Sequence, residues 1–302
     1  MDAARLSEPR RRLIPIESRA GSGEMSVLDF GDPGRPVDVV FVHANGFNAR
    51  TYRTILAPLA AGLRIVAPDL RGHGTTPLPA HQPGRLSWRP FRDDLLGLLE
   101  ALNGPPVTLA GHSMGGAVAL LAAARAKERV ASLALFDPVM WGKAGVALAH
   151  LPWSAALARA RAPIAAAAAR RRSVFESKAA ALASYTGRGA FKGWPEAMVA
   201  DYVADGFRER EDGSVELTCR PDWEALNYST HAHDPYAALR RYGGPAIILK
   251  GVRNSTCRIE DPDAFQRRHP NATVRVVEGG DHFFPMKQPE LVREVLAEAA
   301  GS

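Results

Sequence analysis

The sequence has few cysteines and no long apolar segment. Cys219 and Cys257 are its only cysteines, too few for a disulfide framework and not spaced with a partner as zinc ligands. We therefore expect free thiols in the cytoplasm and no metal. No run free of charged and strongly polar residues approaches the roughly 20 residues of a membrane helix. The basic N-terminus is not followed by an apolar stretch, so we also expect no secretory signal.

The chain also lacks a concentrated excess of one charge. Lys and Arg number 38 and Asp and Glu 32 among 302 residues, and the densest basic clusters are only 10–12 and 170–172. No aromatic residues interleave with these clusters, so we expect no nucleic-acid partner. Hydrophobic residues make up 46% of the chain and charged residues 23%, which is typical of soluble globular proteins and excludes disorder for most of the chain.

Short apolar segments of β type alternate with helical patterns along much of the chain. The strand candidates are residues 37–42, 64–67, 107–110, 130–136, 246–249 and 273–277, and the helix candidates are 91–102, 116–126 and 289–300. Most of the strand candidates are continuously apolar, as in strands buried on both faces. The pattern predicts an α/β fold with a mostly parallel, doubly wound sheet. Segments 13–17 and 25–30, on either side of a Gly-Ser-Gly turn, are expected to form an antiparallel hairpin at its edge.

The alternation stops between about residues 139 and 236. This stretch is rich in alanine, has almost no β pattern, and is divided by Pro152, Pro163 and Pro195 into short helical segments. We therefore predict a core of residues 1–138 and 237–302, and a helical cap of residues 139–236. The cap is expected over the carboxyl ends of the strands, where ligands bind in open α/β sheets.

The strongest functional motif is Gly111-His112-Ser113-Met114-Gly115-Gly116, between a predicted strand and a predicted helix. A nucleophile elbow has this context, with a serine on a strained turn above the sheet. Glycines two positions before and after the serine let strand and helix approach closely. The start of the helix supplies a free N–H, that of Met114, beside the reacting oxygen.

With this elbow, the chain resembles the α/β-hydrolase family over nearly its whole length. After the first long strand comes His43-Ala44-Asn45-Gly46-Phe47, which looks like the family's oxyanion loop. The resemblance implies that the backbone N–H groups of Asn45 and Met114 form the oxyanion hole. His43 itself is expected to be a buried structural histidine. The loop 67–74 is also similar to a loop of the family, and we expect Asp69 and Arg71 in it to form an ion pair.

A serine nucleophile needs a general base, and the base is usually oriented by an acid. In the chain order of the family the histidine comes last, which favours His282, directly after the last predicted strand. The usual place of the acid is taken here by Asn254. Some relatives carry the acid at the end of an earlier strand, which is Asp137 in this chain. We choose Asp137, with Asp261 and Asp263 as alternatives.

These residues predict a serine hydrolase that cleaves a carboxylic ester or lactone of small size through an acyl-enzyme. A thioester or C–C hydrolase and a cofactor-free perhydrolase use the same site, and an α/β-hydrolase-like ligand receptor with little turnover is the alternative of another class. No cofactor motif is present, so no cofactor is expected. Aromatic residues of the cap are expected to line a hydrophobic pocket or to pack the cap: Trp141, Trp153, Phe175, Tyr185, Phe191, Trp194, Tyr202 and Phe207.

Overall fold

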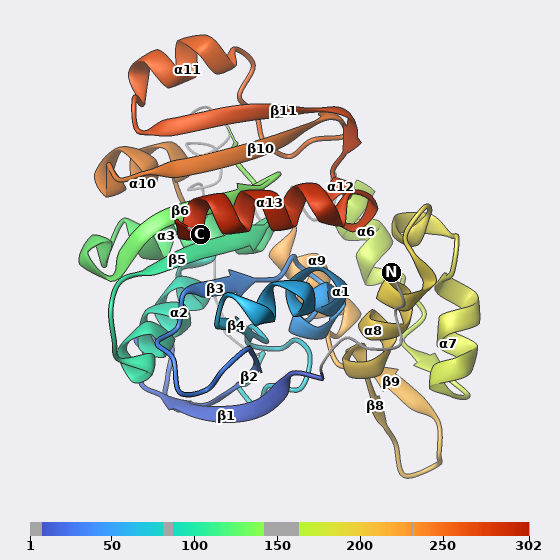
Figure 1. Cartoon of the computed structure of the whole chain (residues 1–302). Helices are drawn as coiled ribbons and strands as arrows, with labels where there is room; N and C mark the ends of the chain where they lie inside the picture. The colour runs from blue at the N-terminus through green and yellow to red at the C-terminus, as the bar shows by residue number, and fades with distance from the viewer. Residues whose placement is uncertain (1–7, 81–86, 142–162, 231, 302) are drawn as a thin grey trace.

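The computed structural model describes residues 8–80, 87–141, 163–230 and 232–301, so the expectations for Pro152 and Trp153 lie outside the described residues. An 8-stranded sheet with the order β1-β2-β4-β3-β5-β6-β10-β11 forms the centre of the molecule (Figure 1). Its strands are β1 (Arg10–Ile16), β2 (Gly23–Phe30), β3 (Val39–Val42), β4 (Ile65–Pro68), β5 (Val107–His112), β6 (Val130–Phe136), β10 (Ala246–Arg253) and β11 (Ala272–Asp281). The six strands from β4 to β11 in that order are parallel, and β1 and β2 form an antiparallel hairpin at one edge. Both predictions are confirmed.

The central strands are buried and mostly apolar because helices cover both faces of the sheet. In β3, Val40 and Val42 face one apolar cluster, whereas Val39 and Phe41 face the other. This follows from the alternation of side chains along a strand. Helices α2 (Arg89–Leu102), α3 (Met114–Ala123) and α10 (Pro235–Tyr242) cover the first face, and α1 (Arg53–Leu56) and α13 (Pro289–Ala300) cover the second.

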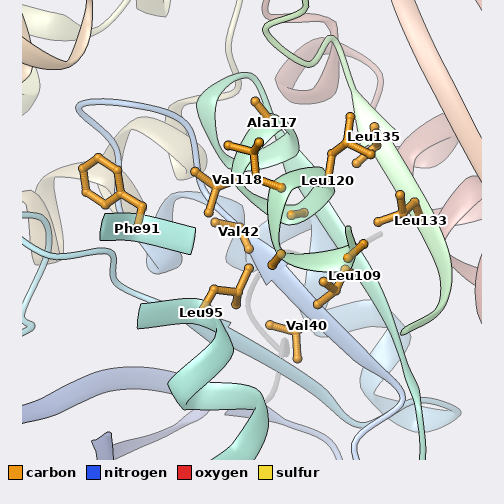
Figure 2. Close-up of a cluster of buried hydrophobic side chains, with 14 of the residues drawn as sticks. Val40, Val42, Phe91, Leu95, Leu109, Ala117, Val118, Leu120, Leu133 and Leu135 are labelled. Atoms are coloured by element: carbon orange, nitrogen blue, oxygen red, sulfur yellow. The ribbon is translucent and has the colours of Figure 1, made fainter. Parts of the chain in front are cut away.

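The packing of α2 and α3 on the sheet fixes the helix that follows the predicted nucleophile. Figure 2 shows part of this cluster, with side chains from β3, β5 and β6 meeting those of the two helices: Val40, Val42, Leu109, Leu133, Leu135, Phe91, Leu95, Ala117, Val118 and Leu120. Each large aliphatic side chain buried here contributes about 1.5–3 kcal/mol. Every residue of α3 is buried, so the helix cannot shift without disturbing the core.

Residues 163–230, here called the insertion, lie between β6 and α10 and are not purely helical. It contains α6 (Pro163–Ala169), β7 (Val174–Phe175), α7 (Lys178–Tyr185), η5 (Gly189–Phe191), α8 (Glu196–Gly206), β8 (Phe207–Glu209), β9 (Val215–Leu217) and α9 (Pro221–Asn227). A 3-stranded antiparallel sheet of order β7-β9-β8 corrects the expectation of almost no strand there. Strands of two or three residues are too short to show a periodicity in sequence.

The insertion lies at one side of the large sheet, where α6, α7, α8, β8 and β9 gather (Figure 1). Ion pairs and hydrogen bonds join it to strands and helices of the rest of the chain. Asp205 of α8 pairs with Arg11 of β1. Asp201 accepts a hydrogen bond from Arg53 Nε at 2.8 Å.

The remaining elements are η2 (Ala49–Tyr52), η3 (Ala57–Ala61), η4 (Lys127–Arg129), α11 (Pro262–Arg268) and α12 (Phe284–Lys287). In the described part of the chain, no helix combines the length and apolarity needed to cross a membrane.

Candidate active site

Ser113 lies on a strained turn between β5 and α3, as the elbow motif predicts. Its φ of 55° and ψ of −117° are rare for a residue with a side chain. A Cβ on Gly115 would lie 2.5 Å from the carbonyl oxygen of His43 and closer still to that of Val42, so only glycine permits this approach of helix and strand. The turn is tied to the neighbouring strand by a 3.0 Å hydrogen bond from Ser113 N–H to Phe136 O.

Asp137 directly follows β6, and its carboxylate is surrounded by donors. Oδ1 accepts from Gly251 N–H at 2.8 Å and from the Ser255 hydroxyl at 2.6 Å. Oδ2 accepts from Thr256 N–H at 2.9 Å and lies 2.7 Å from His282 Nδ1. The backbone of Asp137 itself is strained, with φ 42°. The chain thus holds one fully buried carboxylate against the imidazole at the carboxyl end of the sheet.

The surroundings of Asp137 keep it charged. Burial by itself raises the pKa of a carboxyl, but the hydrogen bond and the charge of His282, with those from Ser255 and Gly251, outweigh burial and lower the pKa of Asp137 below its usual range. The other candidate acids belong to α11: Asp261 caps this helix through Ala264 N–H at 2.8 Å. The structure therefore brings His282 together with Asp137 and not with Asp261 or Asp263.

His112, the neighbour of Ser113, links two loops of the site. Its Nε2 lies 2.8 Å from the carbonyl oxygen of His282, and its Nδ1 lies 2.8 Å from the Tyr52 hydroxyl. A carbonyl only accepts, so Nε2 carries the proton and Nδ1 accepts from Tyr52. Burial, and then the proximity of His282, lower the pKa of His112 to about 3, which keeps this ring neutral. The Tyr52 hydroxyl in turn accepts from Ala44 N–H at 3.2 Å.

The loop of residues 43–47 lies against the elbow because β3 and β5 are neighbours, with Val42 paired to Gly111. His43 is buried, as expected: Nδ1 donates to Ala44 O at 2.7 Å and Nε2 accepts from Leu70 N–H at 2.9 Å. Burial lowers the pKa of His43 to about 4. Met114 is the first residue of α3, so its N–H has no acceptor within the helix and stays at the elbow.

The expected ion pair between Asp69 and Arg71 is wrong. Arg71 is buried and makes a two-pronged contact with Asp94 of α2, at 2.6 and 2.7 Å. Asp69 accepts instead from the backbone N–H groups of Ala49 at 2.8 Å and Thr75 at 2.9 Å. The short side chain of Asp69 thus binds backbone groups near its own turn, whereas the longer side chain of Arg71 reaches α2. The spacing of the two residues in the sequence does not predict these different partners.

Aromatic side chains of the insertion meet both loops of the site. Trp194 packs edge-on against Phe47 at 5.3 Å and lies 5.9 Å from Phe283, the residue after His282. Phe175 and Phe207 pack against Tyr185 inside the insertion, which is a structural role. Of the expected aromatic residues, Trp194 thus contacts the site and Phe175, Tyr185 and Phe207 pack inside the insertion, whereas Trp141 is exposed beside Arg258 and Trp153 lies outside the described residues.

Comparison with known proteins decides the family. A model of the alpha/beta hydrolase family matches residues 39–295. The chain belongs to this family. It is 34% identical to the magnesium-chelatase 30 kDa subunit of Rhodobacter capsulatus over 161 residues, 51% of this chain and 53% of that protein, so it spans about half of that relative's length. It is 26% identical to mouse (Mus musculus) sn-1-specific diacylglycerol lipase ABHD11 over 306 residues, which is 94% of this chain and 91% of that protein.

Solved structures agree with the fold. The crystal structure of E-2-(acetamidomethylene)succinate hydrolase superposes with a TM-score of 0.74 at 21% sequence identity, over 96% of this chain and all of that one (100%). The family model and the solved structure thus agree on the alpha/beta hydrolase fold of the chain. Among the described residues, no group of three or more His, Cys, Asp and Glu side chains is placed to hold a metal ion.

The contacts of three residues of the site are not predicted from the sequence. Ser255 and Thr256 hold the carboxylate of Asp137, and Tyr52 joins the loop of residues 43–47 to His112. The residues Asn254-Ser255, at the usual place of the acid, resemble relatives with the earlier acid and so favour Asp137, but they do not reveal these hydrogen bonds. Tyr52 lies 60 residues from His112, and no local pattern connects the two.

Proposed function

We propose that this chain is a serine hydrolase that cleaves a small carboxylic ester or lactone through an acyl-enzyme. The observation that carries the proposal is the 2.7 Å contact between His282 Nδ1 and Asp137 Oδ2. This contact lies at the carboxyl ends of the parallel strands, where the strained Ser113 also lies. The His282 ring lies 5.0 Å from that of His112, the residue next to the serine. A base oriented by a charged carboxylate is what a serine hydroxyl needs to become a nucleophile.

Each residue has a defined part in the proposed reaction. His282 takes the hydroxyl proton of Ser113 as the oxygen attacks the carbonyl carbon, and returns it to the leaving alcohol. Asp137 holds the proton on Nδ1 of His282 and stabilises the imidazolium. The N–H groups of Asn45 and Met114 stabilise the oxyanion, at about 3 kcal/mol for each donor. Water activated by the same histidine then releases the acid and restores the hydroxyl.

We also propose that residues 139–236 act as a cap over this site, and the sheet domain comprises residues 1–138 and 237–302. Trp194 and Phe191 of the insertion pack together at 5.0 Å, and Trp194 also contacts the loops of Phe47 and His282. Aromatic side chains beside a reactive hydroxyl favour an apolar acyl or aryl group in the substrate.

The test compares wild type with Ser113→Ala on p-nitrophenyl esters, lactones and an acyl thioester, with a fluorophosphonate probe as a second readout. We expect many turnovers on at least one ester or lactone by wild type, and loss of both turnover and labelling in the variant. Turnover that survives Ser113→Ala would refute the nucleophile. Wild type that shifts its melting temperature with a ligand but completes at most one slow acylation would identify a receptor instead.

A further inference from the structure

The side chain of Asn45, whose backbone N–H belongs to the proposed oxyanion hole, is clamped by helix α9 of the insertion. Asn45 Nδ2 donates to the carbonyl oxygen of Glu224 at 3.1 Å, and Asn45 Oδ1 accepts from Asn227 Nδ2 at 2.7 Å. His73 Nε2 lies farther from the same oxygen, at 3.4 Å. Asn45 is 6% exposed and Asn227 0%, so water cannot readily replace these bonds.

The same helix also contacts the next residue of the loop. A Cβ on Gly46, whose φ is 75°, would lie 2.7 Å from Glu224 Oε1, so the loop and the helix are in close contact at this point. Glu224 is fixed by Arg171 at 2.5 Å, and Arg171 also donates to the Tyr202 hydroxyl at 2.8 Å. Helix α9 of the insertion is therefore held in place by Arg171, and it contacts two successive residues of the oxyanion loop, Asn45 and Gly46.

We infer that Asn227 is a positioning residue for the oxyanion hole, acting through the side chain of Asn45; this inference rests on the proposed function. The hydrogen bonds to Glu224 O and from Asn227, at opposite ends of the Asn45 amide, restrain its side-chain torsions beside a further hydrogen bond with the Tyr228 side chain, and so help to position the peptide that carries its N–H. Donors in an oxyanion hole contribute only when they are held in place before charge develops. The insertion thus takes part in stabilising the transition state without touching the substrate at Asn227.

In this role Asn227 stabilises the transition state more than the bound ester. Removing its side chain should therefore lower kcat rather than raise KM. Complete removal of an oxyanion donor lowers kcat by roughly 100- to 1000-fold, so a displaced donor is expected to cost about 10- to 100-fold, with KM changed less than about threefold. Because the proposed role of Asn227 acts through Asn45, Asn45→Ala should cause a similar loss of kcat, and the double variant should be no slower than Asn45→Ala alone.

The experiment measures kcat and KM for wild type, Asn227→Ala, Asn45→Ala and the double variant on one p-nitrophenyl ester, with urea unfolding of each. Ser229→Ala is the matched control: Ser229 lies just beyond the end of α9, and its buried hydroxyl donates to Ala225 O of that helix at 3.1 Å. If Asn227→Ala does not fold, Asn227→Asp keeps the shape and places an acceptor opposite Asn45 Oδ1.

The expected result is a kcat loss confined to the Asn45 and Asn227 variants and not additive between them. Additive losses, a loss in KM alone, or an equal kcat loss in Ser229→Ala would overturn the inference and leave the proposed function intact. A wild type that neither turns over an ester nor reacts with the fluorophosphonate would instead refute the proposed function, and this inference with it.

Discussion

Replacing Asp137 by asparagine tests the hydrogen bonds around this carboxylate, because the groups that contact its two oxygens are donors. An amide nitrogen at the Oδ1 position would face Gly251 N–H, now at 2.8 Å. At the Oδ2 position it would face Thr256 N–H, at 2.9 Å, and His282 Nδ1, at 2.7 Å. The second orientation forces the proton of His282 onto Nε2, and that nitrogen can then no longer accept the proton of Ser113.

Both orientations leave a buried backbone donor facing another donor, that of Gly251 or of Thr256, at about 1–3 kcal/mol of folding stability. Only the second orientation also abolishes the active tautomer, and comparable substitutions in serine hydrolases lower kcat by roughly 10,000-fold. We therefore expect Asp137→Asn to lose most of its kcat on a p-nitrophenyl ester and about 1–3 kcal/mol in urea unfolding.

Asp261→Asn is the matched control, because asparagine also caps helices and the contact with Ala264 N–H should persist. It should match wild type in both measurements. If Asp137→Asn retains kcat within about tenfold of wild type, the 2.7 Å contact does not set the tautomer of His282. A large loss in Asp261→Asn would transfer the role of the acid to that residue.

Three further predictions concern folding stability, each read from urea unfolding. Arg71→Met leaves the buried carboxylate of Asp94 without its two-pronged partner and should cost about 3–5 kcal/mol; a loss under 1 kcal/mol, on the order of a surface pair, would contradict this. Gly115→Ala forces a methyl group onto Val42 O and should cost about 3 kcal/mol or prevent folding, whereas normal stability would show that the turn can relax. The lowered pKa of Asp137 predicts stabilisation that is present above the unfolded pKa of about 3.9 and lost as pH falls through the lower folded value. Wild type should therefore lose more stability below about pH 4 than Asp137→Asn, and identical pH profiles would refute the assignment.

The parts of the fold that sequence predicts are those written in consecutive residues. Parallel strands buried on both faces appear as continuous apolar segments, and the elbow is a motif of six residues with its strand and helix on either side. The small sheet of the insertion is not predicted from the sequence because β7 has only two residues, and such a short strand is stabilised by tertiary packing rather than by a local pattern. Pairings at long separation escape for another reason: Asn45 and Asn227 are 182 residues apart, and nothing local marks either side chain.

The three proposed catalytic groups are not anchored equally. Ser113 and the turn of Asp137 are stitched together by backbone hydrogen bonds, from Ser113 N–H to Phe136 O at 3.0 Å and from Val139 N–H to Ser113 O at 3.2 Å. His282 follows β11, one of the two edge strands of the large sheet, which has β10 as its neighbour there. Edge strands open at lower free energy than central ones. Mild heat or denaturant should therefore displace the imidazole of His282 from Ser113 and Asp137 before the rest of the chain unfolds. Inactivation should then precede global unfolding and should reverse on cooling or dilution.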